Sequence, residues 1–337
     1  MTETRTAVVG AGSWGTALAA VLAGQGHRVR LWAFEAEVVE QVNERHVNES
    51  FLPGAPLPES LRATASMEEA LEGAAFVVSV SPSQFVGRVM TGAAPHLPDD
   101  AIVVSASKGI ETSTLRRMDE VLGDVLSDAQ MEGFTVLSGP SFAVEVAAGE
   151  PTAVVAASAS EEAARSVQEL FQTAIFRVYT NRDVVGVELG GALKNVIAIA
   201  AGVTAGLGFG HNTRAAVITR GLAEMSRLGV AMGAQAETFA GLAGMGDLVL
   251  TCTGELSRNR TVGYRLGQGE TLEEILGPMS AVAEGVKTAE AVVALAERHG
   301  VEMPIASEIH AVLARGKDPR HAVEELMTRE PKPERWR

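Results

Sequence analysis

The sequence predicts an α/β amino-terminal half built on a mostly parallel sheet, followed by an all-α carboxy-terminal half. Three observations support this fold class. Short apolar strands alternate with helical segments as far as Asn181, a glycine-rich turn joins the first strand to the first helix, and no strand pattern follows Asn181. The 337 residues are enough for about two domains.

The composition is that of a soluble globular protein, with 46% hydrophobic and 21% charged residues. Aromatic residues make up only 4%, so we expect a core of Ala, Val and Leu. The formal net charge of −14 argues against nucleic acid or an anionic membrane surface as a partner. An anionic substrate would therefore need a local cationic pocket.

Cys252 is the single cysteine, so no intramolecular disulfide can form and a reducing compartment is expected. We interpret its side chain as a small buried hydrophobe in preference to a reactive thiol. The first residues contain neither a basic segment nor a long apolar one, so we expect no signal peptide and a cytoplasmic location. We expect no metal site.

The first strand, Thr6–Val9, runs directly into the sequence Gly-Ala-Gly-Ser-Trp-Gly and then into a helix. This is the context in which a G-x-G-x-x-G turn binds the pyrophosphate of a dinucleotide. Gly10 would form the tight turn, Gly12 would let the pyrophosphate approach the backbone, and Gly15 would let the helix pack on the strand. Trp14 is either a lid over the pyrophosphate or a packing residue.

The second strand, Arg28–Trp32, is followed by a carboxylate at the position where a ribose-binding acid is expected. Glu35 lies twenty residues after Gly15. A carboxylate there accepts a hydrogen bond from the adenosine 2′-hydroxyl and repels a 2′-phosphate, which favours NAD modestly over NADP. Arg28 and Arg30 are near enough in sequence to offer a 2′-phosphate partner instead.

Further strands are expected, each ending in small, polar or charged residues. Their ranges are Ala75–Val80, Ala101–Ser105, Thr135–Leu137, Thr152–Ala156 and Phe176–Thr180. In an open α/β sheet the carboxyl ends of parallel strands line the ligand crevice. Lys108 follows one of these strands in a Ser-Lys-Gly context. We favour a site role for Lys108 over the alternative of a solvated loop lysine.

Helical patterns occupy most of the remaining sequence. They cover Thr16–Ala23, Glu161–Phe171, Asp183–Thr204, Asn212–Leu228, Ala236–Leu242, a stretch near Asn259–Leu266, Val282–His299 and Pro304–Ala314. We therefore divide the chain into a dinucleotide-binding domain at 1–182, a helical substrate domain at 183–330 and a frayed polar tail at 331–337.

The Asp183–Thr204 helix is apolar on every side, which is typical of a buried helix. Lys194 lies in its middle, and burying an ammonium group costs several kcal/mol unless it is paired or deprotonated. Lys194 could snorkel to the surface or pair with Glu188. The alternative that we favour is a lysine tuned for proton transfer. The lysine and the glycines make the segment a poor membrane span.

Two segments of the helical half are interpreted as loops with polar groups. Gly244–Leu248 places the carboxylate of Asp247 among glycine and apolar residues. Ser257–Arg260 brings two arginines, a serine and an asparagine to a helix start. This second segment is either a phosphate seat, since guanidinium binds phosphate bidentately, or a surface helix start capped by Ser257.

These motifs together resemble the soluble NAD(P)-dependent glycerol-3-phosphate dehydrogenases of bacterial type, and the resemblance covers essentially the whole chain. It is carried by the segments Gly10–Ala17, Ser138–Ala143, Gly190–Val196, Ile218–Met225, Gly241–Leu248, Thr251–Thr253, Ser257–Arg260 and Val282–Gly285. The first segment is shared by many dehydrogenases. The segment around Lys194 and the region from Asp247 to Arg260 are specific to the family.

The resemblance implies a role for each matching residue. Lys194 would be the catalytic proton donor and acceptor, aided by Lys108 and Asp247. The residues that would contact the substrate are Lys108, Gly139, Ser141, Lys194, Asp247, Ser257, Arg258 and Asn259. Those that would bind the cofactor are Gly10, Gly12, Ser13, Trp14, Gly15, Phe34, Glu35, Lys108, Ala143, Arg258, Val282 and Glu284.

The resemblance further implies reversible reduction of dihydroxyacetone phosphate to sn-glycerol 3-phosphate, supplying glycerophospholipid synthesis, by a homodimer that uses NAD or NADP. Bacterial relatives often carry His or Arg where this chain has Phe34, so the Phe34-Glu35 pair is more similar to the NAD-using branch. Two alternatives stay open. One is another two-domain dehydrogenase acting on a 3-hydroxy acid or a sugar-acid phosphate, and the other is a non-catalytic nicotinamide-binding sensor.

Overall fold

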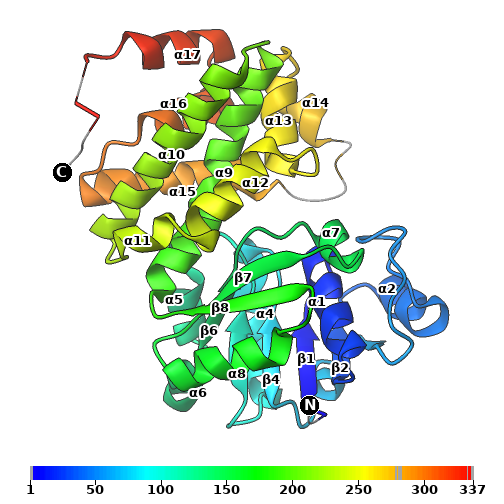
Figure 1. Ribbon diagram of the computed structural model, residues 1–337. Coiled ribbons are helices and arrows are strands. Elements are labelled where there is room, and N and C mark those ends of the chain that lie inside the picture. Colours follow the sequence, from blue (N-terminus) through cyan, green and yellow to red (C-terminus); the bar gives the residue numbers. More distant parts are fainter. Residues whose placement is uncertain (1–2, 278, 280–282, 332, 335–337) are drawn as a thin grey trace.

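The computed structural model describes residues 3–277, 279, 283–331 and 333–334, and it confirms the two-part architecture. A single sheet with flanking helices forms the amino-terminal part, and helices alone form the carboxy-terminal part (Figure 1). The helical part lies over the edge of the sheet at which β1 ends (Figure 1). The carboxyl ends of the parallel strands, where ligands are predicted to bind, therefore face the helical part.

The sheet has eight strands in the order β3-β2-β1-β4-β5-β6-β7-β8. They are β1 (Arg5–Val9), β2 (Arg28–Trp32), β3 (Arg62–Thr64), β4 (Phe76–Ser79), β5 (Ile102–Ser105), β6 (Thr135–Ser138), β7 (Thr152–Ala157) and β8 (Phe176–Asn181). Neighbouring strands are parallel except at β6 and β7, which pair antiparallel. The carboxyl ends of β1, β4, β5 and β6 therefore share one edge.

Helices cover both faces of this sheet (Figure 1). They are α1 (Ser13–Gly24), α2 (Ala36–Glu40), α3 (Met67–Leu71), α4 (Val86–Ala93), α5 (Met118–Gly123), α6 (Asp128–Glu132), α7 (Ala143–Ala147) and α8 (Glu161–Phe171), with π- or 3-10 turns η1 (Gln41–Arg45), η2 (Ser83–Phe85) and η3 (Ala94–His96). Two apolar clusters fill the space between the sheet and the helices on its two faces.

The described residues of the carboxy-terminal part form helices and the turns that connect them. Its elements are α9 (Val184–Gly206), α10 (His211–Ala231), α11 (Ala236–Phe239), η4 (Leu242–Gly246), α12 (Asp247–Thr253), α13 (Arg258–Gly267), α14 (Leu272–Leu276), α15 (Glu284–His299), α16 (Pro304–Arg315) and α17 (Pro319–Thr328). The segment interpreted as a loop at Gly244–Leu248 is instead the end of η4 and the start of α12. The sequence pattern also did not reveal β3, the helices α2 to α7, or α14 and α17.

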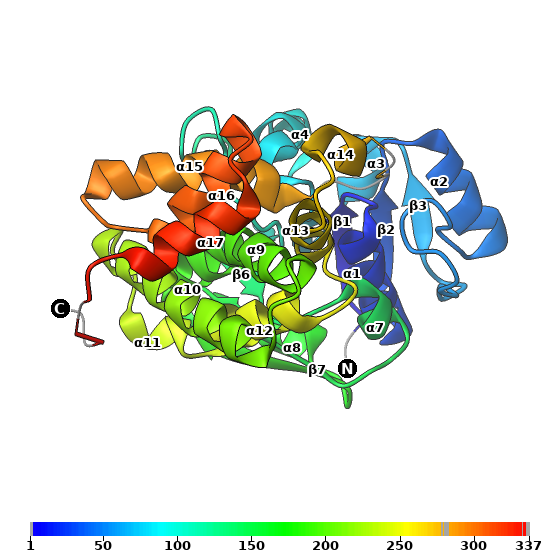
Figure 2. The same ribbon diagram turned by 90° about the horizontal axis from the view of Figure 1, so that it is seen from above.

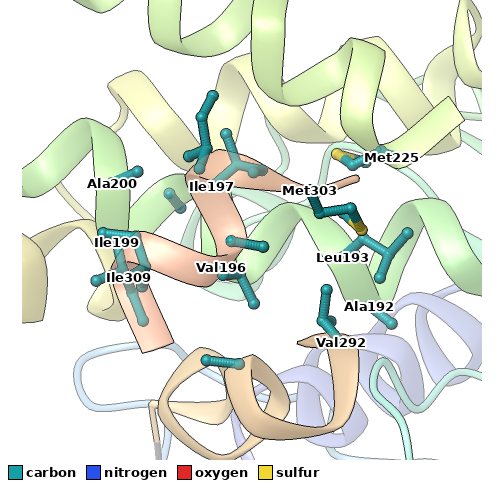
Figure 3. Packing of buried hydrophobic residues seen from close by; sticks show 14 of the residues in the cluster. Ala192, Leu193, Val196, Ile197, Ile199, Ala200, Met225, Val292, Met303 and Ile309 are labelled. Carbon is teal, nitrogen blue, oxygen red and sulfur yellow. The ribbon is translucent and has the colours of Figure 1, made fainter. Parts of the chain in front are cut away.

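The long apolar helix α9 is the centre of the helical part, as its pattern predicted. Seen from above in Figure 2, α9 runs among α10, α12, α13 and α16. Figure 3 shows the apolar side chains around it, among them Leu193, Val196 and Ile197 packed near Met225 and Met303. By length and composition α9 could cross a membrane, but 89% of its most apolar window is buried inside the protein. It is the core helix of this part.

Glycines let α9 and α13 pack backbone against backbone. A Cβ atom added at Gly263 would lie 2.0 Å from the carbonyl oxygen of Ile199, and one at Gly202 would lie 2.1 Å from that of Arg260. Neither position tolerates a side chain at this helix separation. The close approach fixes α13, and the segment at its amino end, relative to α9.

Candidate active site

The glycine-rich turn has the geometry that a pyrophosphate needs. Gly10 has φ +124°, and a Cβ atom added there would lie 2.7 Å from the carbonyl oxygen of Val80. A Cβ atom at Gly15 would lie 1.9 Å from the carbonyl oxygen of Gly10, whereas one at Gly12 would meet nothing within 4 Å. The open space beside Gly12, at the amino end of α1, fits an incoming phosphate pair.

Neighbouring segments hold this turn in place. The buried Asn48 amide donates to the carbonyl oxygen of Ala11 at 2.9 Å and to the Thr16 hydroxyl at 2.8 Å. The Ser13 hydroxyl donates to the backbone oxygen of Phe51. Trp14 is partly buried against the apolar cluster of the sheet, which favours the packing interpretation of its side chain.

The end of β2 presents an exposed carboxylate and an exposed ring. Glu35 is exposed at the position before α2, and Phe34 is 78% exposed. The alternative that Arg28 or Arg30 swings in is not supported. Arg28 stands at the opposite end of β2, beside Arg5 of β1, and pairs with Glu3, while Arg30 lies 3.9 Å from Glu69. The preference for NAD therefore stays a prediction, and neither Arg28 nor Arg30 is placed to bind a 2′-phosphate instead.

Two lysines from different domains share one buried carboxylate. Lys194, on α9, places its Nζ 2.5 Å from Oδ1 of Asp247, the first residue of α12. Lys108, just after β5, places its Nζ 2.8 Å from Oδ2 of the same carboxylate and 2.9 Å from the carbonyl oxygen of Gly139. Lys194 neither reaches the surface nor pairs with Glu188, so both of these alternatives for Lys194 are wrong. Lys108 is likewise not a solvated loop lysine.

The electrostatics of this triad suit proton transfer. Burial lowers the pKa of Lys194 to about 8, against the attraction of Asp247, which raises it, and with the repulsion of Lys108, which lowers it further. Burial raises the pKa of Asp247, but the two lysines outweigh that effect and hold the carboxyl below its ordinary value. A lysine that titrates near pH 8 can both donate and accept a proton.

Thr251 is a site residue that the sequence analysis did not assign. Its hydroxyl accepts a hydrogen bond from Lys194 Nζ at 2.9 Å and donates to the backbone oxygen of Asp247 at 2.6 Å. The threonine thus fixes a second donor direction of the Lys194 ammonium. Its position one turn after Asp247 on a helix was the available signal, but that required α12 to be recognised as a helix.

The Ser257–Arg260 segment begins α13 and combines both interpretations left open. The Ser257 hydroxyl accepts from the Arg260 backbone N–H at 3.2 Å, so it caps the helix, yet its side chain is buried. Asn259 donates to Asn195 Oδ1 at 3.0 Å and accepts from the Gly285 N–H at 2.9 Å. It therefore joins α9, α13 and α15, while the neighbouring Arg258 is exposed and available to an anion.

The structure describes some of the remaining predicted residues by their contacts and others only by their position. Ser141 donates to the carbonyl oxygen of Gly139 at 3.0 Å, and Ala143 begins α7 just beyond it. Glu284 begins α15, where burial raises its carboxyl pKa and the charge of Arg258 opposes that rise. The predicted cofactor contact of Val282 lies outside the described residues.

Cys252 behaves as the small hydrophobe that was predicted. Its side chain is 1% exposed, and burial raises the pKa of the thiol to about 12. A thiol with that pKa is protonated at neutral pH and is a poor nucleophile. Among the described residues, no three His, Cys, Asp or Glu side chains gather as a metal ion would require.

Comparison with known proteins gives one consistent family. Residues 5–164 match the model for the NAD-dependent glycerol-3-phosphate dehydrogenase N-terminus, and residues 183–324 match the model for the C-terminus. Similar curated proteins, named glycerol-3-phosphate dehydrogenase (NAD(P)+), come from Citrifermentans bemidjiense and Geobacter sulfurreducens. Each is 61% identical to this chain. The match with the Citrifermentans protein covers 97% of this chain and 98% of the relative, and the match with the Geobacter protein covers 98% and 99%. The crystal structure of glycerol-3-phosphate dehydrogenase from Coxiella burnetii is similar with a TM-score of 0.92 and 42% identity, covering 97% of this chain and 99% of that one.

Proposed function

We propose how the residues of this chain carry out the reaction of its family. The chain belongs to the NAD-dependent glycerol-3-phosphate dehydrogenase family. It interconverts dihydroxyacetone phosphate and glycerol 3-phosphate with NAD(P). The observation that carries the proposal is the shared Asp247 carboxylate, which holds Lys108 and Lys194 from two domains at 2.8 and 2.5 Å. Neither the alternative dehydrogenases nor a non-catalytic sensor is favoured by these relatives.

Lys194 is proposed as the group that moves the proton. When bound, nicotinamide would provide or take up the hydride at C2 of the three-carbon substrate. As the carbonyl oxygen gains negative charge during reduction, Lys194 donates a proton to it, and during oxidation its neutral amine takes the proton back. Asp247 and Thr251 accept two of the three N–H groups of the Lys194 ammonium, so the third N–H has a fixed direction and can point to the substrate oxygen.

Lys108 and the start of α13 are proposed to bind and orient the substrate. The Lys108 ammonium lies at the carboxyl end of the parallel strands, where it would stabilise developing charge on the substrate oxygen. Arg258, with Asn259 and Ser257 behind it, would hold the phosphate, which fixes the distance between C2 and Lys194. Gly139 and Ser141 would contact the substrate from the α/β side.

The cofactor is proposed to lie across the Gly10–Gly15 turn, with its pyrophosphate in the open space beside Gly12. Glu35 would accept from the adenosine 2′-hydroxyl, which gives a modest preference for NAD over NADP. Ser13, Trp14, Phe34, Ala143 and Glu284 would complete its binding site. The division at 1–182 and 183–330 would then separate cofactor binding from substrate binding.

We also propose a homodimer located in the cytoplasm, where the product would supply glycerophospholipid synthesis. Exposed apolar side chains such as Val144, Val249 and Leu256, which are 48%, 40% and 50% exposed, support an interface between two copies. Sedimentation of the purified protein would test this, since a monomer at micromolar concentration would contradict it.

The test of the proposed function is the absorbance of reduced nicotinamide after the purified protein is mixed with dihydroxyacetone phosphate and either NADH or NADPH. We expect oxidation of both cofactors, and at low cofactor concentration we expect NADH to be oxidised faster than NADPH. Lys194→Ala should lose about 10²- to 10⁴-fold in rate, the range of general acid–base catalysis, and should still bind the reduced cofactor. Near-normal turnover by Lys194→Ala would refute the assignment of the proton carrier.

A further inference from the structure

The loop that carries Lys108 leaves the α/β domain and enters the core of the helical domain. It follows β5 and ends at α5, and its Ile110 side chain is fully buried in the apolar cluster around α9. Leu115, further along the loop, packs against the same cluster. Gln84 accepts from the backbone N–H of Thr112 at 3.0 Å and so supports the loop from the α/β side.

The far end of this loop is attached to α9 by a buried polar cluster. Glu188 of α9 accepts a hydrogen bond from the Asp119 backbone N–H at 3.0 Å, at the amino end of α5. Arg117 places its Nε 3.7 Å from Glu188 Oε2 and donates two hydrogen bonds of 3.0 Å to the Asp119 carboxylate. Glu120 stands 3.5 Å from the same guanidinium. These are the charged groups that face Glu188 in the part of the chain that the structure describes.

This arrangement is costly for a purely structural contact. The Glu188 side chain is only 4% exposed, and one guanidinium serves three carboxyl groups. Burial accordingly raises the pKa of the Glu188 carboxyl well above its usual range. An apolar residue of similar size at a buried position is often as stable as an ion pair, or more stable. Retaining a carboxyl here therefore needs a reason other than stability.

The position of Glu188 on α9 suggests that reason. Lys194 follows six residues later on the same helix, about 9 Å along its axis. The Lys108 loop is thus fixed to the helical domain at two places. Lys108 binds Asp247 of α12, which pairs with Lys194 of α9, and Arg117 and the amino end of α5 bind Glu188 of α9. Because Glu188 and Lys194 lie on one rigid helix, fixing the loop at Glu188 also fixes its position relative to Lys194.

We propose that Glu188 is a positioning residue for the reaction: by holding the amino end of α5 against α9, it keeps Lys108 on the Asp247 carboxylate that Lys194 shares. This inference rests on the proposed function, since it requires that Lys194 moves the proton. Glu188 contacts neither of these side chains directly and acts through the loop between Lys108 and Arg117.

Loss of this attachment should change the reaction in a way that loss of stability does not. If Lys108 leaves Asp247, Lys194 loses a repelling cation and keeps its carboxylate partner, so its pKa rises. Glu284, from α15, also acts on Lys194 and raises its pKa. The pH at which the rate of reduction falls should therefore move to a higher value.

The experiment compares three variants of the full-length protein with the wild type. Glu188→Ala removes the attachment, and Glu188→Gln keeps an oxygen that can accept from the Asp119 N–H. Glu120→Gln is the matched control, because it removes a carboxylate from the same cluster without touching α9. The readouts are kcat, KM for each substrate, the pH profile of kcat and the thermal midpoint.

We expect Glu188→Ala to lower kcat about 10- to 100-fold, the loss that a displacement of about 1 Å produces in a catalytic group. Its pH limb should move upward, while Glu188→Gln and Glu120→Gln stay close to wild type in both. If Glu188→Ala does not fold, Glu188→Asp, which is one carbon too short to reach Asp119, should give the same result.

A normal kcat and an unmoved pH limb in Glu188→Ala would overturn the proposal. So would a lower thermal midpoint with a normal rate per folded molecule, because that is the signature of a structural role alone. The proposed function fails separately: near-normal turnover by Lys194→Ala would show that Lys194 is not the proton carrier, whatever the Glu188 variants do.

Discussion

The pKa of Lys194 predicts opposite pH dependences for the two directions of the reaction. Lys194 must carry a proton to reduce dihydroxyacetone phosphate and must lack it to accept one during oxidation. With a pKa lowered to about 8, the ratio of charged to neutral amine is about 10 to 1 at pH 7 and about 1 to 10 at pH 9. The maximal rate of reduction should fall about tenfold for each pH unit above this pKa, and that of oxidation about tenfold for each unit below it.

Two substitutions should move this pKa in opposite directions. Asp247 raises the pKa of Lys194 and Lys108 lowers it, so Asp247→Asn should shift the pH limb downward and Lys108→Met should shift it upward. For the Lys194–Asp247 pair, with charges about 3 Å apart at an effective dielectric constant of about 20, the interaction is about 5 kcal/mol, or about 4 pKa units. Relaxation and entering water reduce this value, so we expect shifts of at least about one unit.

The assay is the absorbance of reduced nicotinamide at saturating substrate, measured in both directions from acid to alkaline pH. A deuterium label on the transferred hydride serves as the control, because a full isotope effect shows that hydride transfer limits the rate at each pH. Profiles that are flat in both directions would refute the assignment of Lys194. Shifts of the same sign in Asp247→Asn and Lys108→Met would refute the electrostatic reasoning.

Three further predictions concern Thr251, Gly263 and Glu224. Thr251→Val removes the acceptor for a Lys194 N–H and should lower kcat about tenfold with the fold intact, by circular dichroism, since a hydrogen bond to a charged group contributes about 1.5–3 kcal/mol. Gly263→Ala forces a Cβ atom against the Ile199 carbonyl and should lower the free energy of unfolding in urea by about 1–3 kcal/mol. Gly24→Ala, where nothing lies within 4 Å, is its control. Burial raises the pKa of Glu224 to about 7 although the carboxylate accepts two N–H groups of α16. The folded state therefore holds this proton more tightly than the unfolded state, so stability should fall by up to about 3 kcal/mol as pH rises from the ordinary value of 4.5 to about 7, and should change no further above that. Glu224→Gln should flatten that part of the urea midpoint against pH.

The fold was predictable where local pattern and tertiary role agree. Seven strands and the central helix α9 were expected within two residues of their observed ends. Most of these strands and α9 are buried and leave apolar runs, whereas in β2 and β8 exposed residues alternate with buried apolar ones. The strand β3 has only three residues, Arg62–Thr64, and is an edge strand, so it leaves almost no pattern. The helix α12 was missed because Gly244 and Gly246 before Asp247 indicate a loop.

The candidate site was predictable by residue type but not by contact. A lysine in an apolar helix and a lysine after a buried strand each stand out in the sequence. Their meeting at Asp247, which is 139 residues from Lys108 and 53 from Lys194, depends on the packing of two domains. Thr251 stands out only once α12 is recognised as a helix, and the sequence suggests Glu188 only as a partner for Lys194, because the contacts of Glu188 with Arg117 and the Asp119 N–H depend on tertiary packing.

The shared carboxylate also resolves the conflict between an acidic protein and an anionic substrate. The chain carries a net charge of −14, yet at the site two lysine ammoniums face one carboxylate, and Arg258 adds a further cation. Glu284 is the further carboxyl group that acts on these cations, and burial raises its pKa while Arg258 and the two lysines oppose that rise. Exposed charges of the remaining surface are screened within about 10 Å at moderate salt, whereas the buried triad is not. The site is therefore locally positive even though it contains the Asp247 carboxylate. That carboxylate is what allows two ammonium groups to be buried side by side, and its two lysine partners keep it ionised.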